Sequence, residues 1–322
     1  MTDTSENTPL SPPVLSMRDG DITIASLIDL YMAHYAGRDG SRLQRLGWWS
    51  AQLGAVRLDE VTDDHLHVAI ESLTGQAARY YAGKDADGHA IHKAKRKPIA
   101  PATLNRYAAS ISAVFTWAIR RRVAPKGWDH PGRRIERRPE NNEKTRFLSG
   151  DERDRLLSAC KASKWPRLYL LVLMALTTGA RKGELQGLRW PDVDLAQRLA
   201  HVGRTKNGDP RALPLVPAVV EELQRFKPDN NTGLVFLSAR HPGQAYAFEP
   251  MFHEAMRVAR IKGVTFHTMR HSCASMLAQS GATRLEIADV LGHRQLQMTK
   301  RYSHLTTTHK TAMVNRRLGD LR

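Results

Sequence analysis

The chain has 322 residues, of which 41% are hydrophobic, so it is long enough for two domains and can bury a sizeable core. Lysine and arginine outnumber aspartate and glutamate by 49 to 32, which gives a formal net charge of +17. These values exclude a largely disordered chain. The longest apolar run, residues 168–176, has about half the length that a membrane span needs and predicts a buried helix.

Targeting and redox features both favour the cytoplasm. The N-terminal residues MTDTSENTPLSPP are polar and lack the basic and apolar blocks of a secretory signal. Cys160 and Cys273 are far apart, each in an apolar helical context, which predicts buried free thiols. Free thiols suit a reducing compartment. We therefore expect a cytoplasmic protein.

The positive charge is concentrated in one part of the chain. Residues 79–146 contain 17 basic and 6 acidic side chains, so +11 of the net charge falls in about a fifth of the sequence. Such a concentration is typical of proteins that bind a polyanion, because each neutralised phosphate releases condensed counterions. A merely well-solvated basic surface is the alternative. We expect a nucleic acid as the partner.

The N-terminal part of the chain has the apolar spacing of helices. Residues 1–21 are polar and predict a flexible tail, after which Ile24, Leu27, Ile28 and Tyr31 repeat at helical spacing. The segments predicted as helices begin at residue 22 and then cover 43–53, 63–73 behind a Thr62 cap, and 103–122. We therefore expect a compact four-helix domain over residues 22–122.

Two segments of this region lack helical spacing. The polar insert 75–98 predicts a loop that contains a short hairpin around Asp87 and Gly88. Residues 123–145 combine several prolines with many arginines and few apolar residues, which predicts a basic linker.

The remainder, residues 146–322, is expected to form a second ordered domain. Ser149 and Glu152 predict a capping box at its first helix. Residues 199–215 change to strand spacing, with a hairpin turn predicted at Asn207-Gly208. The pattern becomes helical again after Val216. The second domain is therefore predicted as mainly α with a small β-sheet, an α+β fold.

Two stretches of this domain place basic side chains where packing does not require them. In TTGARKGELQGLRW, Arg181 and Glu184 share one helical face, which an ordinary surface ion pair would also explain. Lys206 precedes the predicted turn of the hairpin, where its ammonium can deliver a proton to a leaving oxygen or contact a phosphate. An isolated turn lysine is usually only solvated, so each signal is weak by itself.

Two further stretches carry histidines and a tyrosine. His267 and Arg270 lie on one helical face, and His271 follows four residues after His267, a spacing that also suits zinc. The intervening residues TMR contain a cation and no acid, so a structural hydrogen-bonding role for His271 is favoured over a metal site. His293 follows a helix that Thr283 and Glu286 cap, and Tyr302 comes nine residues later. A tyrosine after two basic residues is, alone, more often a surface aromatic.

Taken together, these residues resemble the active-site pattern of the tyrosine recombinases, also called phage integrases. The resemblance covers residues 149–310 and extends more loosely over 22–122, which is similar to the helical core-binding domain of the family. It implies that residues 146–322 form the catalytic domain. The pattern consists of Arg181, Lys206, His267-x-x-Arg270, Gly292-His293 and, nine residues further on, Tyr302.

The resemblance implies a role for each basic residue in attack on a DNA phosphodiester. Arg181 and Arg270 would clamp the nonbridging oxygens, and His293 would add a hydrogen-bond donor. Lys206 would protonate the departing 5′-hydroxyl oxygen. Glu184 falls on a position where the family often has a supporting acid.

The implied nucleophile is Tyr302, whose phenol has an ordinary pKa of about 10 and needs help near neutral pH. His267 is the better candidate for the general base, and how proton transfer divides between His267 and Lys206 stays open. The product would be a 3′-phosphotyrosine that keeps the bond energy, so strand exchange would need neither ATP nor metal. The sequence contains no phosphate-cradling glycine loop and no clustered carboxylates for Mg²⁺. No cofactor and no metal are expected.

The family resemblance also implies partners. The substrate would be double-stranded DNA held in a clamp, with Asn105 and Arg106 as hypothesised groove contacts and Lys95, Arg96 and Lys97 as further DNA-binding candidates. A C-terminal helix packing onto a neighbouring protomer would give a homo-tetramer on paired sites in the bacterial nucleoid. The alternative is that this helix folds back on its own domain. An accessory DNA-bending or directionality protein is compatible with this arrangement.

Several functions remain open at this point. Integration or excision of a phage or mobile element is favoured by the insert and the basic linker, and a short tail before residue 22 leaves no room for an arm-binding domain. A chromosome-dimer resolvase of the same family is the alternative. A DNA-binding regulator without chemistry and a relaxing enzyme similar to type IB topoisomerases are the other candidates.

Overall fold

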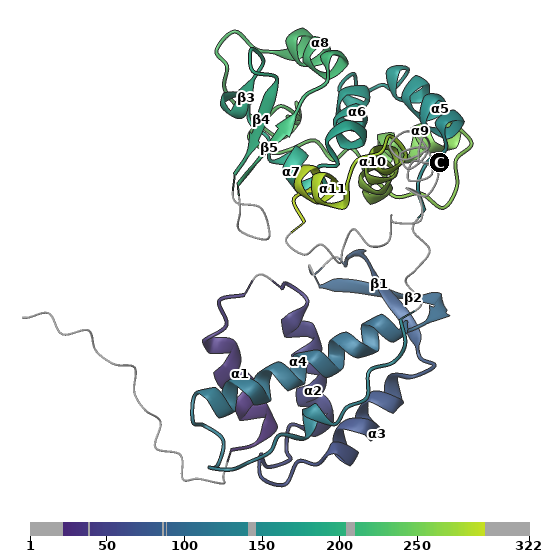
Figure 1. Ribbon diagram of the computed structural model, residues 1–322. Helices are drawn as coiled ribbons and strands as arrows, with labels where there is room; N and C mark the ends of the chain where they lie inside the picture. The colour runs from purple at the N-terminus through teal and green to yellow at the C-terminus, as the bar shows by residue number, and fades with distance from the viewer. Residues whose placement is uncertain are drawn as a thin grey trace, which may run out of the picture. The chain divides into compact units, whose positions relative to one another are not determined.

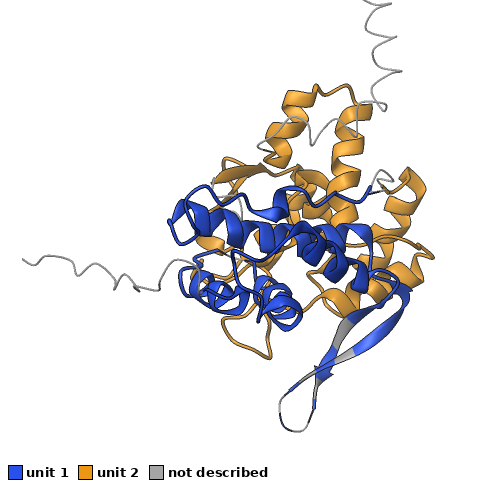
Figure 2. Cartoon of the chain, turned by 90° about the horizontal axis from the view of Figure 1, so that it is seen from below, with its two compact units in different colours: residues 1–141 blue, residues 142–322 orange. Residues whose placement is uncertain are grey.

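The structure is a computed structural model that describes residues 22–37, 39–85, 87, 89–140, 146–203 and 210–293. The chain divides into two compact units, residues 1–141 and 142–322 (Figure 2). The predicted tail over residues 1–21 lies outside the described residues.

The first unit is built on four helices, and all four correspond to helices predicted from the sequence. Thr23 and Thr62 cap the first and third helices with their side-chain oxygens. The helices bury their apolar faces against one another, with Leu27, Trp49 and Phe115 fully enclosed. The helices are α1 (Ile24–Ala33), α2 (Arg42–Leu53), α3 (Asp63–Leu73) and α4 (Pro101–Arg120).

The insert between α3 and α4 forms a longer hairpin than the sequence predicted. Strands β1 (Ala77–Lys84) and β2 (Ala90–Pro98) pair antiparallel, with two register irregularities. Tyrosines favour strand structure in β1, and the Asp85 N–H donates a hydrogen bond to the His89 carbonyl oxygen at 2.9 Å between the two strands. The hairpin extends from the helices of the first unit (Figure 2). The two strands therefore occupy most of the insert, where the sequence predicted a loop with a short hairpin.

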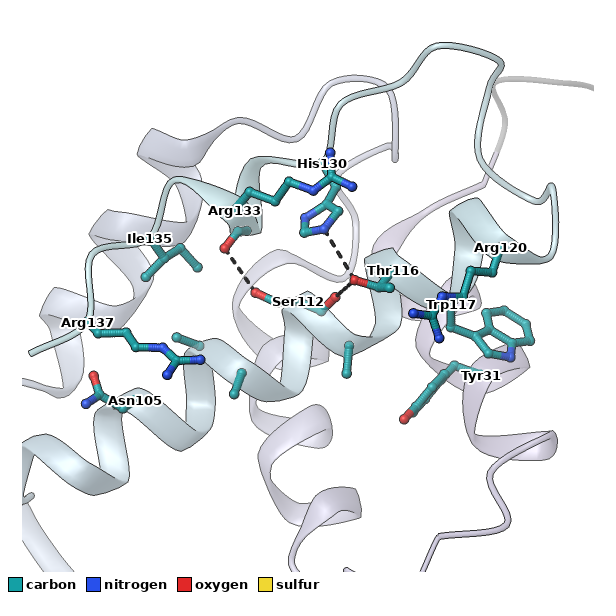
Figure 3. A pocket seen from close by; sticks show the side chains of 14 residues that line it. Tyr31, Asn105, Ser112, Thr116, Trp117, Arg120, His130, Arg133, Ile135 and Arg137 are labelled. Atoms are coloured by element: carbon teal, nitrogen blue, oxygen red, sulfur yellow. Dashed lines mark hydrogen bonds between the residues drawn. The ribbon is translucent and has the colours of Figure 1, made fainter. Parts of the chain in front are cut away.

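The segment after α4 also differs from its prediction as a linker. Residues 123–140 belong to the first unit: Ala124 is buried, and the Trp128 ring meets Phe115 edge-on with centroids 5.4 Å apart. The segment includes a short 3₁₀ turn, η1 (Pro131–Arg133), and lies along α4 (Figure 3). Ala124 and Trp128 therefore pack part of the stretch that the sequence predicted as a linker against the first unit.

The second unit combines seven helices with a small sheet within the described residues, as predicted for an α+β fold (Figure 1). The helices are α5 (Gly150–Lys161), α6 (Leu168–Thr178), α7 (Lys182–Gln186), α8 (Pro217–Phe226), α9 (Glu249–Val258), α10 (His267–Gln279) and α11 (Arg284–Leu291). The capping boxes predicted at Ser149 and Thr283 are both present.

The sheet of the second unit has the order β3-β4-β5 and is antiparallel. Its strands are β3 (Val193–Asp194), β4 (Leu199–Val202) and β5 (Arg211–Pro214). A 3₁₀ turn, η2 (Trp190–Asp192), leads into β3. The predicted strands on either side of the turn are confirmed, whereas the turn itself, residues 204–209, lies outside the described residues.

Helix α6 forms the centre of the second unit. Nine of its eleven residues are buried, and it packs against α5, α8 and α10. The apolar run is therefore a core helix, as predicted, and no helix of the described residues has the length and apolar character to cross a membrane. Cys160 and Cys273 are buried free thiols, and burial raises the pKa of each to about 12.

Candidate active site

The candidate site starts where α6 ends. Gly179 closes α6 in the left-handed conformation, with φ of 60°, which a residue without a Cβ adopts at little cost. The chain then turns sharply, and Arg181 takes the N-cap position of α7. Arg181 is thus held at a helix start that directly follows the most buried helix of the unit.

Glu184 fixes the orientation of Arg181. One carboxylate oxygen accepts a hydrogen bond from the Arg181 guanidinium, and the other accepts one from the Arg181 backbone N–H, each at 2.8 Å. Burial by itself would raise the pKa of the Glu184 carboxyl, but hydrogen bonds from Arg211 and Arg181 outweigh it and hold the pKa below its ordinary value. The predicted Arg181–Glu184 pair is therefore an ion pair between a half-buried guanidinium and a buried carboxylate.

The second arginine of the pattern comes from α10. Arg270 is 4% exposed, and its Nη1 donates a hydrogen bond to the carbonyl oxygen of Gly179 at 2.7 Å. Gly179 lies two residues before Arg181, so one backbone turn positions both arginines. The structure thereby places the Arg270 guanidinium against the backbone turn that carries Arg181, although the two residues are 89 positions apart in the sequence.

The end of α11 joins the same cluster. Gly292 closes α11 in the left-handed conformation, and the backbone N–H of His293 donates to the carbonyl oxygen of Ala288 at 2.8 Å. The Arg181 Nη2 lies 3.5 Å from the carbonyl oxygen of Gly292. His293 is half-buried and directly follows Gly292, whose carbonyl oxygen the Arg181 side chain approaches. Helices α7 and α11 and strand β5 lie close together in Figure 1.

His267 lies at the first position of α10, one helical turn before Arg270, and is exposed. Its ring meets the ring of His271 edge-on, with centroids 4.8 Å apart.

Among the described residues, three metal-ligating side chains approach one another only at Asp85, Asp87 and His89, which are exposed and lie between β1 and β2. There the Asp85 carboxylate accepts hydrogen bonds from the backbone N–H groups of Asp87 and His89, a turn contact.

Two residues of the predicted site, Lys206 and Tyr302, lie outside the described residues. The structure describes the strands that flank Lys206: β4 ends at Val202, and β5 begins at Arg211. For Tyr302 it describes the chain as far as His293.

Arg211 is a residue of this cluster that the sequence analysis missed. Its side chain is 11% exposed, and its Nη2 donates to a Glu184 carboxylate oxygen at 2.7 Å. Arg211 is in phase with Leu213 and Leu215, both buried, and side chains at every second residue of a strand share a face. A basic residue in phase with two core leucines is the signal that would have found it.

The DNA-contact candidates of the first unit have different environments. The Asn105 amide donates to the Arg138 carbonyl oxygen and accepts from the Arg138 N–H, both at 2.9 Å, so Asn105 holds the segment after α4. This contact gives Asn105 a structural role, and its groove contact stays a prediction. Arg106 is exposed, as are Lys95, Arg96 and Lys97 on β2.

A surface pocket lies between α4 and the segment that Asn105 holds (Figure 3). Small residues of α4 form its floor, and Arg120, Arg133 and Arg137 line it. Within it, Ser112 donates a hydrogen bond to the Gly132 carbonyl oxygen at 3.1 Å. The pocket therefore adds a second group of arginine side chains to the surface of the first unit, besides the basic residues of the hairpin.

Comparison with known proteins places the chain in a family. Residues 146–309, about half of the chain, match the phage integrase family. The chain belongs to the phage integrase family, as the sequence pattern indicated.

Individual relatives support this assignment. The shufflon-specific DNA recombinase of Escherichia coli is 32% identical over 65% of this chain and 52% of its own length. The integrase of Salmonella phage P22 is 24% identical over 87% of this chain and 74% of its own length. The putative integrase of Pseudomonas phage Pf1 is 31% identical over 66% and 60% respectively. The chain thus spans about half the length of the first of these relatives.

Solved structures share the fold. An integrase of the Tn1549 transposon in complex with circular intermediate DNA aligns with a TM-score of 0.67 and 20% identity, over 92% of this chain and 99% of that chain. A lambda integrase dimer bound to a core site aligns with a TM-score of 0.62 and 17% identity, over 88% and 78% respectively. These alignments confirm the predicted fold class.

Proposed function

We propose that this chain is a site-specific DNA recombinase that cleaves and rejoins strands through a 3′-phosphotyrosine at Tyr302. The observation that carries the proposal is the anchoring of Arg270 on the Gly179 carbonyl, two residues from Arg181. Two guanidinium groups fixed at one backbone turn suit a phosphate that gains negative charge during attack.

The remaining roles follow from the same chemistry. Attack by the Tyr302 oxygen on phosphorus forms the P–O(Tyr) bond and breaks the bond to the 5′ oxygen. Lys206 is proposed to donate a proton to that leaving oxygen, and His267 to accept the proton of the phenol. His293 is proposed to donate a hydrogen bond to a nonbridging oxygen. Glu184 orients Arg181 and takes no part in proton transfer.

A nicked duplex that carries the junction sequences of the element encoding the gene tests this reaction. The nick lets the short 5′ product diffuse away, so a covalent protein–DNA adduct accumulates. We expect the adduct with the wild type and none with Tyr302→Phe, whose binding in a gel-shift assay stays unchanged. Absence of an adduct with both proteins would instead support a DNA-binding regulator.

Rejoining between two defined sites separates a recombinase from an enzyme that only relaxes DNA. We propose integration or excision of a phage or mobile element as the role, because relatives from phages P22 and Pf1 carry the name integrase. Recombination of one attachment pair on a plasmid is the expected result. Reaction of two chromosomal dimer-resolution sites alone would favour the resolvase.

The proposed assembly is a homo-tetramer on two paired duplexes in the nucleoid, with room for an accessory bending or directionality protein. Each protomer would supply one Tyr302, so four strands are cleaved in two rounds. Mass photometry of the protein with a two-site DNA is the direct measurement. A particle with two protomers on one site only would contradict the tetramer.

The β1–β2 hairpin is proposed to contact DNA phosphates. Lys95, Arg96 and Lys97 are consecutive and exposed, and none of the three forms an ion pair with another described residue. Side chains at successive strand positions point to opposite faces, so this stretch presents charge on both sides of the hairpin. That suits electrostatic contact with a backbone better than base recognition.

Salt dependence of binding tests the hairpin. Replacing the three residues by glutamine should make the slope of log affinity against log salt shallower by about 2 to 3, since each phosphate contact contributes about 0.9. The matched control replaces Lys164, Lys227 and Lys262, three exposed lysines of the second unit, by glutamine. An equal change of slope in the control would contradict a specific role for the hairpin.

A further inference from the structure

Arg211 connects three elements of the second unit with one guanidinium group. It extends from the first residue of β5. Its Nη2 donates to Glu184 of α7, and its Nη1 donates to the carbonyl oxygen of Val290 in the last turn of α11. Arg181 makes a comparable pair of contacts, to Glu184 and, at 3.5 Å, to the carbonyl oxygen of Gly292 at the end of α11.

The second contact stabilises a helix end. The last carbonyl groups of a helix lack partners within the helix and carry partial negative charge, so a cation there is favourable. Arg211 supplies such a cation to α11 from outside the helix. Its stem also lies against Gly292, where an added Cβ would come within 2.8 Å of the Arg211 Cδ. The left-handed turn at Gly292 and the position of Arg211 therefore fit one another.

The turn that Arg211 holds leads directly to His293. The His293 N–H is bonded to the Ala288 carbonyl in the same turn, so the backbone of His293 follows the end of α11. On the other side, Glu184 accepts hydrogen bonds from both Arg211 and Arg181. Arg211 and Glu184 thus form a continuous link between the helix start with Arg181 and the helix end with His293.

We infer that Arg211 is a positioning residue that fixes His293 relative to Arg181, without itself touching DNA. This inference rests on the proposed function, because the distance between Arg181 and His293 matters only if both residues bind the same phosphate. A planar guanidinium with two donating nitrogens is required, since a lysine ammonium at the same place can reach only one of the two acceptors.

Two other roles would explain a buried arginine equally simply. As a stabilising ion pair alone, Arg211 would contribute to stability without a specific partner in the reaction. As the first residue of the strand that follows Lys206 in the sequence, it would instead position the leaving-group acid. The experiment has to distinguish three effects of Arg211: positioning of His293, positioning of Lys206, and stabilisation of the fold in general.

A double-mutant cycle on the full-length protein makes this separation. Single-turnover cleavage of the nicked junction duplex is measured at saturating protein for the wild type, Arg211→Met, His293→Gln and the double variant. We expect Arg211→Met to slow cleavage by about tenfold or more in the wild-type background, and by less than about threefold once His293 is replaced. Arg211→Lys should recover part of the rate, because it restores one contact.

Two controls keep the result interpretable. Thermal unfolding and gel-shift affinity establish that each variant is folded and bound at the assay temperature. The same variants are also measured on a duplex with sulfur in place of the 5′ bridging oxygen, whose thiolate leaves without a proton. The Arg211→Met loss should persist on this substrate, because His293 acts on the nonbridging oxygens.

Three outcomes overturn the assignment of Arg211. They are an unchanged rate for Arg211→Met, an equal loss in both His293 backgrounds, and a loss that disappears on the sulfur substrate. The last outcome would assign Arg211 to Lys206 instead. If the wild type forms no adduct at all, the proposed function itself is contradicted, and this result is distinct from the other three.

Discussion

The guanidinium of Arg270 donates a hydrogen bond to the carbonyl oxygen of Gly179 at 2.7 Å, joining α10 to the turn between α6 and α7. Arg270 is buried, so this bond replaces solvation that the cation loses on folding. Because of this contact, the position of the Arg270 guanidinium depends on the backbone turn that carries Arg181. Changes to either partner should therefore affect catalysis more than binding.

Gly179→Ala should destabilise the second unit by about 2 kcal/mol or more. A Cβ at this left-handed position is strained, and it would lie 2.3 Å from the Leu291 Cδ2. Gly183→Ala is the matched control, because its Cβ would meet nothing within 4 Å and it lies in α7. Urea unfolding of both variants checks the difference. Equal stability of the two variants would show that the turn tolerates a side chain.

Arg270→Lys should lower the cleavage rate by about 10² to 10³ while the affinity for the junction duplex changes by less than about tenfold. Lysine keeps the charge but cannot bond Gly179 and also present a second donor towards a phosphate. Single-turnover cleavage and gel-shift titration give the two numbers. A parallel loss of rate and affinity would mean that Arg270 contributes to binding in general.

Glu184→Gln should change the pH dependence of stability. The pKa of Glu184 is held below its ordinary value, so its contribution is fully present above the ordinary pKa and is lost as pH falls through the lowered folded-state pKa. The difference in free energy of unfolding between wild type and variant should therefore stay constant above about pH 6 and shrink below about pH 4.3. Urea titrations at several pH values measure it, and a difference that grows on acidification would contradict the assigned direction.

Asn105→Ala should loosen the segment after α4 without removing a DNA contact. The side chain satisfies both the N–H and the carbonyl of Arg138, so its loss should cost about 1 to 3 kcal/mol. Hydrogen exchange should show loss of protection at the Arg138 amide. Arg106→Ala, one residue further and exposed, should leave that amide protected and weaken DNA binding. A reversal of these two results would restore Asn105 as a groove contact.

Local signals account for what the sequence predicted well. The caps at Thr62, Ser149 and Thr283 are each found where the sequence places them, because a capping box is formed by residues three positions apart. The buried character of α6 also follows from its own apolar run. The pairing of Arg181 with Glu184 is likewise a contact within one turn.

The features that were missed are contacts between distant segments. Arg211 bonds Glu184 and Val290, which lie 27 and 79 positions away, and nothing in RALPL indicates which carboxylate it meets. Residues 123–140 have the composition of a linker but are held by Asn105, 33 positions before Arg138. In both cases the composition of a segment indicates how well water solvates it. The position of the segment depends on contacts with residues elsewhere in the sequence, which its own residue pattern does not reveal.

The charge of the β1–β2 hairpin has a consequence for the protein before it meets DNA. In the described part of the chain the hairpin is a sheet of two strands, so each strand exposes one edge of backbone N–H and C=O groups. Open edges of this kind pair readily with strands of other molecules unless charged side chains prevent it. Lys93, Lys95 and Lys97 are all exposed along β2 and repel a second copy. A neutral hairpin would therefore leave the free protein prone to self-association.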